Sequence, residues 1–425
     1  GGAEIASVAA SKQSSFREFP VDGEPRRLVL DRDTGLLLVA SAMHPATSCL
    51  CALDPVSGQV QTRVQFLPSE RVCSLATWYV QGPKMYRYVC VGTAQHSAQR
   101  SASGRLLIYS LKQAKRRVRA KAAAPGAPDA TGAFELKYVW ESERGGPVSA
   151  LASMGDVFLV VAVGASCVVL RLDVEHRQVV ECCSCALRFP VTSLDVDGHD
   201  IVAGSEREAV NVLRFSPGDG HDRLEVLHSA RFGVSAADAR FLAPGLVAGV
   251  DRSGYVFVVG IPEGPSEFAL DFVLGFHLGT ECTRLRPESL VVTTIDGAVW
   301  TVMRITDDAL VLLRLLEQAM LHMPLLHPAR PLFAPGGATT RARGAGRIPP
   351  ANVVDGALAA VFADALTEAE QVQVVDSSPD LGRMAREMAA RDGGLGTGGA
   401  APEASASAAR FISGLVHALA RTGAC

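Results

Sequence analysis

The chain has 425 residues, 48% of them hydrophobic and 20% charged, which is enough to bury a large core and to form more than one structural unit. The 41 Lys and Arg residues and the 44 Asp and Glu residues give a formal charge of −3, which argues against strong autonomous binding of DNA or RNA, because neutralised phosphates supply most of that affinity. Ten cysteines are too few for a disulfide scaffold, and the longest apolar run is too short to cross a bilayer.

One unit of short apolar strands separated by turns occurs six times along the chain. The repeats open near Pro25, Val72, Pro147, Val191, Val234 and Cys282, at spacings of 47, 75, 44, 43 and 48 residues. Periods of about 40–50 residues with several strands each are typical of β-propeller blades. The repeat therefore predicts a mainly β fold, a β-propeller that is seven-bladed or incomplete, with about six blades visible.

The first two repeats each show four strands. Those of the first repeat are predicted at 25–30, 35–40, 49–54 and 58–64, and those of the second at 72–78, 86–93, 104–109 and 134–140. The sequence Asp-Pro-Val-Ser-Gly at 54–58 predicts a hairpin turn between two of these strands. The second repeat is long because it carries an insertion at about 112–132.

A run of basic residues opens this insertion. Its members are Lys112, Lys115, Arg116, Arg117, Arg119 and Lys121. The Ala, Pro and Gly residues that follow are typical of a flexible loop. Three interpretations stay open for the basic run: a solvated loop, a nuclear-import patch, or a loop that contacts phosphate groups.

The later repeats follow the same pattern. Strands are predicted at 148–151, 157–163, 167–172 and 179–183, then at 191–196, 200–204, 210–215 and 224–228, then at 236–241, 245–250, 254–259 and 268–276, and finally at 290–294 and 298–304. These lengths are ordinary for strands.

Beyond the repeats, the sequence changes to helical patterns. Helices are predicted at 310–322 and at about 357–372, where Asp355 is placed to cap the second one. Residues 391–408 have the composition of a disordered segment, and an apolar stripe from Phe411 to Leu419 predicts a last helix. We therefore expect a flexible tail at 1–15, the propeller at 16–309, and a small α-helical C-terminal domain at 310–425 with a disordered linker near 388–408.

Motifs of catalytic or metal sites are weak in this chain. A Gly-x-Gly-x-x-Gly pattern at 394–399 lies in low-complexity sequence without a preceding strand. The sequence Cys-Cys-Ser-Cys at 182–185 has no second cysteine pair or histidine at zinc spacing. We expect no enzyme activity, no cofactor and no metal.

The order of several segments resembles the CPSF A-subunit superfamily. The segments are VGTA at 91–94, GRLLIY at 104–109, GPVSAL at 146–151, IVAGS at 201–205 with AV at 209–210, AGVDRSGYVFV at 248–258, FHLG at 276–279 and NVVDGAL at 352–358. The resemblance covers about 16–372. One departure is at 231–233, where family members often carry a Trp and this chain has Arg-Phe-Gly.

This resemblance implies a fold and a type of function. The superfamily includes the damage-specific DNA-binding adaptor of cullin ubiquitin ligases, a spliceosomal propeller subunit and the large cleavage and polyadenylation subunit. Its members are expected to have three propellers and a small helical C-terminal domain, and this chain resembles the third propeller with that domain. Asn352-Val353 and Asp251-Arg252 lean slightly toward the RNA-processing members.

The preferred functional hypothesis is a non-catalytic scaffold subunit of a nuclear complex, for pre-mRNA splicing or cleavage and polyadenylation. Arg231, Phe232 and Arg252 are the predicted partner contacts, because Arg and aromatic side chains dominate interface energetics. Its partners would be other protein subunits, with RNA or DNA reached at most indirectly, and with no membrane and no small-molecule substrate. The alternatives are a substrate adaptor of a cullin-type ubiquitin ligase linked to DNA damage, and a nucleic-acid-binding module that uses the basic loop 112–121.

Overall fold

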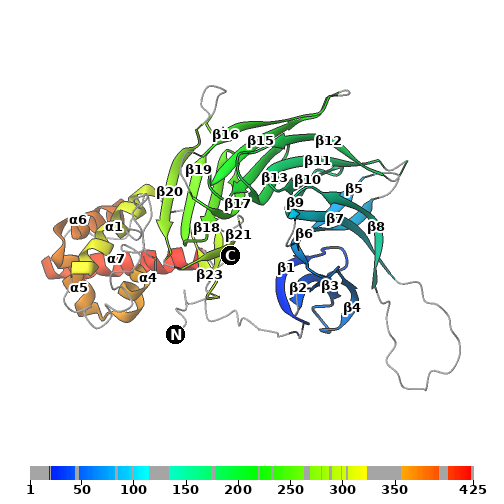
Figure 1. Cartoon of the computed structure of the whole chain (residues 1–425). Helices are drawn as coiled ribbons and strands as arrows, with labels where there is room; N and C mark the ends of the chain where they lie inside the picture. The colour runs from blue at the N-terminus through cyan, green and yellow to red at the C-terminus, as the bar shows by residue number, and fades with distance from the viewer. Residues whose placement is uncertain are drawn as a thin grey trace, which may run out of the picture. The chain divides into compact units, whose positions relative to one another are not determined.

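The computed structural model contains sheets and helices in two compact units (Figure 1). The first unit holds β1 to β16 and most of β17, and the second holds the end of β17, the strands from β18 to β23 and the helices. The structure describes residues 19, 21–43, 47–81, 85–97, 100–113, 134–173, 176, 178–218, 221–230, 234–262, 269–278, 280–286, 290–297, 299–302, 305–322, 356–391 and 401–422.

The first three sheets each have four strands. They contain β1 (Glu24–Leu30), β2 (Leu37–Met43), β3 (Thr47–Leu53) and β4 (Val60–Gln65); β5 (Glu70–Val80), β6 (Tyr86–Ser97), β7 (Arg100–Gln113) and β8 (Phe134–Arg144); and β9 (Val148–Met154), β10 (Phe158–Val163), β11 (Ser166–Asp173) and β12 (Gln178–Ala186).

The last three sheets include one with three strands. They contain β13 (Val191–Asp197), β14 (Asp200–Ser205), β15 (Val210–Ser216) and β16 (Arg223–Ser229); β17 (Ala236–Ala243), β18 (Leu246–Asp251), β19 (Tyr255–Gly260) and β20 (Asp271–His277); and β21 (Cys282–Arg286), β22 (Val291–Thr294) and β23 (Val299–Thr301).

Consecutive strands are neighbours in every described sheet, so each sheet is an antiparallel meander. Such sheets, repeated at the period seen in the sequence, are the blades of a six-bladed β-propeller. The predicted fold class, a mainly β propeller followed by helices, is confirmed.

Turn chemistry fixes the hairpin predicted at 54–58. The carboxylate of Asp54 accepts hydrogen bonds from the Val56 backbone N–H at 2.9 Å and from the Ser57 hydroxyl at 2.6 Å. Gly58 closes the turn with a φ of +74°, in the region that glycine adopts without steric cost. The turn therefore sets the register of β3 against β4.

Hydroxyl side chains connect successive sheets of the first unit through their first strands. Ser74 on β5 donates to the carbonyl of Val148 on β9 at 2.8 Å. In the same way, Ser149 on β9 donates to Val191 at 2.6 Å, and Thr192 on β13 donates to Ala236 at 2.6 Å. Each bond satisfies a backbone carbonyl, so it contributes about 0.5–1.5 kcal/mol and fixes how neighbouring sheets approach.

Glycines on the second strands make room for these bonds. A Cβ at Gly92 would collide with the Ser74 hydroxyl and would lie 2.7 Å from the carbonyl oxygen of Val148. Gly204 lies against the Thr192 and Ser193 hydroxyls in the same way. Both glycines belong to segments of the family resemblance, so that part of the resemblance has a physical cause.

Apolar side chains fill the space between neighbouring sheets. Leu38 and Leu50 of the first sheet join one buried cluster with Val89 of the second. A second cluster joins Trp78 of the second sheet to Val161 of the third. Each such side chain, fully buried, stabilises the fold by about 1.5–3 kcal/mol.

A buried ion pair lies within the second sheet. Glu70 is 1% exposed, and Arg105 binds its two carboxylate oxygens at 2.9 and 2.6 Å. Thr93 adds a third hydrogen bond, at 2.7 Å. Burial alone would raise the pKa of Glu70, but the hydrogen bonds from Arg105, Thr93 and the Leu67 backbone outweigh it and lower the pKa below its ordinary value.

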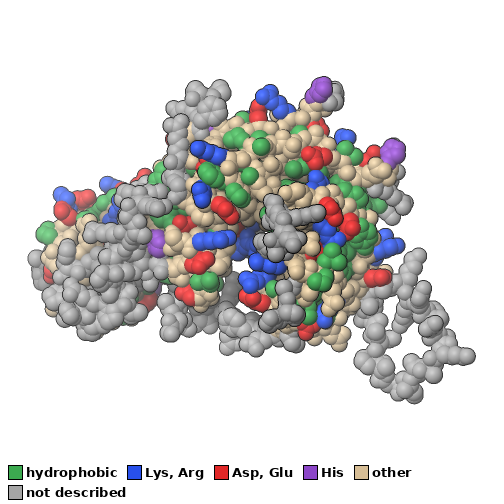
Figure 2. Space-filling model, viewed as in Figure 1, with side chains coloured by type: hydrophobic (Ala, Val, Ile, Leu, Met, Phe, Trp, Pro, Cys, Tyr) green, Lys and Arg blue, Asp and Glu red, His purple; other side chains and the backbone are tan. Residues whose placement is uncertain are grey.

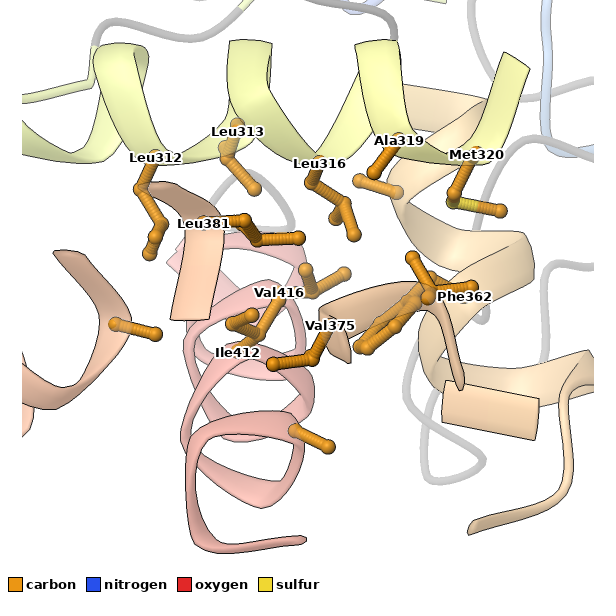
Figure 3. Close-up of a cluster of buried hydrophobic side chains, with 14 of the residues drawn as sticks. Leu312, Leu313, Leu316, Ala319, Met320, Phe362, Val375, Leu381, Ile412 and Val416 are labelled. Carbon is orange, nitrogen blue, oxygen red and sulfur yellow. The ribbon is translucent and has the colours of Figure 1, made fainter. Parts of the chain in front are cut away.

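The C-terminal helices pack around their own core. They are α1 (Asp307–His322), α4 (Gly356–Ala360), η2 (Val361–Ala365), α5 (Glu368–Ser377), α6 (Pro379–Arg391) and α7 (Ala401–Thr422). Figure 3 shows Leu316, Phe362, Val375, Leu381 and Ile412 pointing toward one another from five of these elements. Because all five are at most 2% exposed, this core ties the helices together.

The helix predicted at 357–372 is interrupted. Leu366 is extended, and Thr367 starts a new helix by accepting a hydrogen bond from the Glu370 N–H, while the Glu370 side chain accepts from the Thr367 N–H. This capping box satisfies two helix-end donors, so it favours a fresh start over a continuous helix. The predicted cap, Asp355, lies outside the described residues.

The segment predicted as a linker near 388–408 is helical at both ends. Residues 388–391 belong to α6 and residues 401–408 to α7, while 392–400 lie outside the described residues. The reason is burial of small side chains: Ala408 and Ala409 are fully buried in the helical core. The predicted tail at 1–15 also lies outside the described residues.

We predict that Gly92→Ala destabilises the protein by about 1–3 kcal/mol, because the added methyl group overpacks the contact between sheets. Gly145→Ala is the matched control, since its Cβ would meet no atom within 4 Å; the expected change is neutral or slightly stabilising. Urea denaturation measures both. Equal effects of the two substitutions would contradict the role given to Gly92.

We predict that Arg105→Ala lowers the free energy of unfolding by about 3–5 kcal/mol at pH 7, because it leaves the Glu70 carboxylate buried without its partner. The control is Arg214→Ala, which removes an exposed two-point pair with Asp200 and costs at most about 1 kcal/mol.

The same pair predicts a pH dependence. In the wild type, the lowered pKa of Glu70 contributes stability that is present above the unfolded pKa of about 4.3 and is lost as pH falls through the folded pKa. In Arg105→Ala, burial raises that pKa, so protonation stabilises the folded variant. Denaturation at pH 4 and pH 7 should therefore show a smaller gap between the two proteins at pH 4, and a gap independent of pH would contradict this.

Candidate partner-binding surface

Arg252, one of the predicted partner contacts, is exposed in the turn between β18 and β19. The preceding Asp251 braces this turn, because its carboxylate accepts hydrogen bonds from the Ser253 hydroxyl at 2.8 and 2.6 Å and from the Tyr255 backbone N–H at 2.6 Å. Gly254 has a φ of +97°, and a Cβ there would collide with the carbonyl of Thr280. The turn therefore presents Arg252 from a fixed backbone.

The other two predicted contacts, Arg231 and Phe232, lie outside the described residues. They belong to the connection between β16 and β17, which joins the last strand of one sheet to the first strand of the next. Their role as partner contacts stays a prediction.

Of the basic run, the structure describes only Lys112, which is exposed near the end of β7 opposite Glu135 on β8. Lys115, Arg116, Arg117, Arg119 and Lys121 lie outside the described residues. The run follows the third strand of its sheet, whereas Arg252 follows the second strand of another. Because connections alternate between the two ends of an antiparallel meander, Lys112 and Arg252 lie at opposite ends of their sheets.

A cluster that sequence reasoning missed lies within the first unit. Arg188 and Phe189 are in the connection between β12 and β13, and Arg207 is in the connection between β14 and β15. The guanidinium carbon of Arg188 is 5.6 Å from the centre of the Phe189 ring, and that of Arg207 is 5.7 Å from it. We call these three residues the Arg-Phe-Arg cluster.

The Arg-Phe-Arg cluster combines exposure with order. Both arginines are exposed and the ring is half-buried. Each cation–π contact at such a site is worth about 0.5–1 kcal/mol, and Arg188 also pairs with Glu208 at 3.4 Å. Arg and aromatic side chains held in this way are typical anchors of protein interfaces.

A sequence signal for this cluster was present. The tetrapeptide Arg-Phe-Pro-Val at 188–191 and the tetrapeptide Arg-Phe-Gly-Val at 231–234 both occur in the sequence between the last strand of one sheet and the first strand of the next, although the first ends on the opening residue of β13 and the second ends two residues before β17. A comparison of the repeats could therefore have found Arg188 and Phe189. Arg207 comes close to the Phe189 ring only through the turn between β14 and β15, and no sequence pattern indicates this contact.

The described residues carry no constellation of a metal centre, since no three His, Cys, Asp or Glu side chains among them converge to hold an ion. Burial, more than any other effect, raises the pKa of the Cys182 and Cys183 thiols to about 11. Both thiols are therefore protonated at neutral pH and are poor nucleophiles. In the described part of the chain, no helix is both long and apolar enough to cross a membrane.

We predict that Asp251→Ala destabilises the protein by about 1–3 kcal/mol, because the buried N–H of Tyr255 loses its acceptor. Trypsin should then cleave after Arg252 faster than in the wild type. Asp251→Asn, which keeps one acceptor oxygen, should fall between the two proteins. Cleavage at the wild-type rate in Asp251→Ala would show that the carboxylate does not hold this turn.

Comparison with known proteins agrees with this architecture. A comparison with curated proteins found no significant match. The family model of the CPSF A subunit region matches residues 47–364, a span that contains β3 to β23, α1 and α4. Because the match covers well over half of the chain, this protein belongs to the CPSF A subunit family.

Proposed function

We propose that this protein is a non-catalytic scaffold subunit of a nuclear assembly that processes pre-mRNA, by splicing or by cleavage and polyadenylation. Membership of the CPSF A subunit family supports a propeller scaffold of the mRNA-processing or DNA-damage-binding type. The observation that carries the proposal is the Arg-Phe-Arg cluster, an exposed anchor for a protein partner on ordered connections between strands.

Rigidity explains how such a scaffold would bind. The sheets are held by buried side chains and by hydrogen bonds between their first strands. Connections fixed in this way lose little conformational entropy on binding, so more of the contact energy appears as affinity. In this proposal, partners dock on two kinds of connection between strands. The first kind leads into the first strand of a sheet and includes the connection with Arg188. The second kind joins the second strand to the third and includes the connections with Arg207 and Arg252.

The nuclear location and the class of assembly form the finer part of the proposal. A sequence similarity of the Asp251-Arg252 region to RNA-processing members supports them. A cullin-type ubiquitin ligase adaptor would have the same architecture, so the identity of the captured partners must separate the two. The net charge of −3 speaks against direct nucleic-acid binding through 112–121.

We predict that Phe189→Ala combined with Arg207→Ala lowers the capture of splicing or polyadenylation subunits from nuclear extract at least tenfold. Loss of one hot-spot residue costs 2 kcal/mol or more, and about 1.4 kcal/mol is a factor of ten. Quantitative mass spectrometry of the purified complexes is the measurement.

The matched control combines Val56→Ala with Arg223→Ala. Both side chains are exposed, and both lie at the ends where third strands connect to fourth strands. Capture should persist in this control. Recovery of cullin subunits in place of RNA-processing subunits would make the ubiquitin adaptor the correct function, and RNA binding with steep salt dependence, lost on neutralising 112–121, would favour the nucleic-acid module.

A further inference from the structure

A recess lined by arginines lies between the first and second sheets of the first unit. Its volume is about 190 Å³, well above the roughly 10–15 Å³ that holds one water molecule. The lining residues are Arg26, Arg27, Ala40, Ser41, Ala42, Ser48, Arg71, Val72 and Cys73. They come from the start of β1, the end of β2 and the starts of β3 and β5. This is the end of a sheet at which the first strand begins and the second strand connects to the third. The Arg-Phe-Arg cluster lies at the same end of its own sheet.

Two arginines of this recess, Arg26 and Arg71, keep most of their charge available. No carboxylate in the described part of the chain forms an ion pair with Arg71. Arg26 pairs with Glu24 at 2.8 Å, but both side chains are at least half exposed, so this pair is weak and easily exchanged. Figure 2 shows Lys and Arg side chains (blue) close together beside the position that β1 occupies in Figure 1.

Arg27 is oriented by the backbone. Its guanidinium donates to the carbonyl oxygens of Cys73 and Arg26. Arg27 and Arg71 both lie near the Cys73 thiol: burial raises the pKa of this thiol, and the two guanidinium charges counteract the rise. The recess is therefore electropositive at the point where two strands from different sheets meet.

A neighbouring acid does not cancel this charge. Glu70 precedes Arg71 in the sequence, but its carboxylate is engaged by Arg105 and Thr93 within the second sheet. The buried ion pair thus neutralises the acid that directly precedes Arg71.

The wall of the recess contains a hydroxyl group without a partner. Ser41 is 1% exposed, and its Oγ makes no hydrogen bond in the structure. A buried polar atom of this kind costs free energy unless a ligand or water satisfies it. In contrast, Ser48 already accepts a hydrogen bond from the Val72 backbone N–H at 3.3 Å.

Three guanidinium groups and one hydroxyl donor fit a phosphoryl group. A phosphorylated serine carries a charge of about −1.5 to −2 and three strong acceptor oxygens, and guanidinium groups bind such oxygens in pairs. A nucleic-acid strand fits less well, because none of the lining residues is an aromatic side chain on which a base could stack.

We propose that the recess lined by Arg26, Arg27, Arg71 and Ser41 binds the phosphoryl group of a phosphoserine or phosphothreonine in a partner polypeptide. This inference rests on the proposed function, since it names the chemistry by which the scaffold recognises a partner. Binding through this site makes recruitment depend on phosphorylation of the partner, while the sheets themselves stay unchanged.

The test uses the full chain and a fluorescent pool of short peptides with a central phosphoserine and randomised flanks. Fluorescence anisotropy should show binding at least tenfold tighter than for the same pool without phosphate. Arg71→Gln and Arg26→Gln should each weaken binding at least tenfold, and Ser41→Ala several-fold. The control Arg223→Gln removes an exposed charge at the opposite end of its sheet and should leave binding unchanged.

Thermal melting first confirms that each variant folds, and two arginine variants are used so that misfolding of one does not decide the result. Equal binding of the two pools, or unchanged binding in both arginine variants, would overturn the proposal. So would displacement of the peptides by inorganic phosphate at equal concentration, which would indicate a site for the free anion. Binding of an RNA oligonucleotide, but not of the phosphopeptides, through Arg71 would assign the recess to nucleic acid instead.

Phosphatase treatment of nuclear extract separates this inference from the proposed function. Loss of captured partners after treatment supports the phosphoryl site. Capture that is unaffected by phosphatase overturns the site and leaves the scaffold function standing. An absence of RNA-processing partners in treated and untreated extract alike contradicts the proposed function itself.

Discussion

The hydrogen bonds between the first strands of successive sheets are the constraint on which the first unit depends. Ser74, Ser149 and Thr192 each donate to a carbonyl on the first strand of the following sheet. These bonds need space beside the second strand, so the residue at that place has no side chain: it is Gly92 in one sheet and Gly204 in another. Apolar clusters then fill the space between the sheets. Because the strands are held in this way, the connections at the sheet ends are held in fixed positions too. A partner-binding surface made of such connections needs no reorganisation before it binds.

Charge is distributed so that a buried carboxylate is neutralised inside a sheet, while several arginines lie at the sheet ends. Glu70 and Arg105 satisfy each other inside the second sheet, and Arg214 pairs with Asp200 at the surface. In the recess, Arg27 donates to backbone carbonyls and Arg26 pairs with the exposed Glu24. In the Arg-Phe-Arg cluster, both arginines contact the Phe189 ring, and Arg188 also pairs with the partly buried Glu208. A chain with a small net negative charge can thus present local positive sites suited to acidic or phosphorylated partners without a general affinity for nucleic acid.

The sequence was sufficient for the fold because its signals are local and repeated. Turn residues such as Asp54 and Gly58 and the period of the repeat identified the strands, and the resemblance identified the family. The break at Leu366 was missed although Thr367 and Glu370 carry the capping signal, because the apolar pattern continues across it. The recess and the approach of Arg207 to Phe189 join residues from separate strands, so only the folded chain brings them together. Arg231 and Phe232, which lie outside the described residues, remain predictions of the sequence.

The central claim is that protein partners bind the ordered connections that lead into first strands or join second strands to third strands. Hydrogen–deuterium exchange of the chain, alone and in complex with its purified partners, tests this claim most directly. The account predicts slower exchange on complex formation at 187–190, 206–208 and 251–254, and unchanged exchange at the opposite connections, such as 54–58. Protection confined to 54–58 and the other connections of that type, with none at the Arg-Phe-Arg cluster, would contradict it.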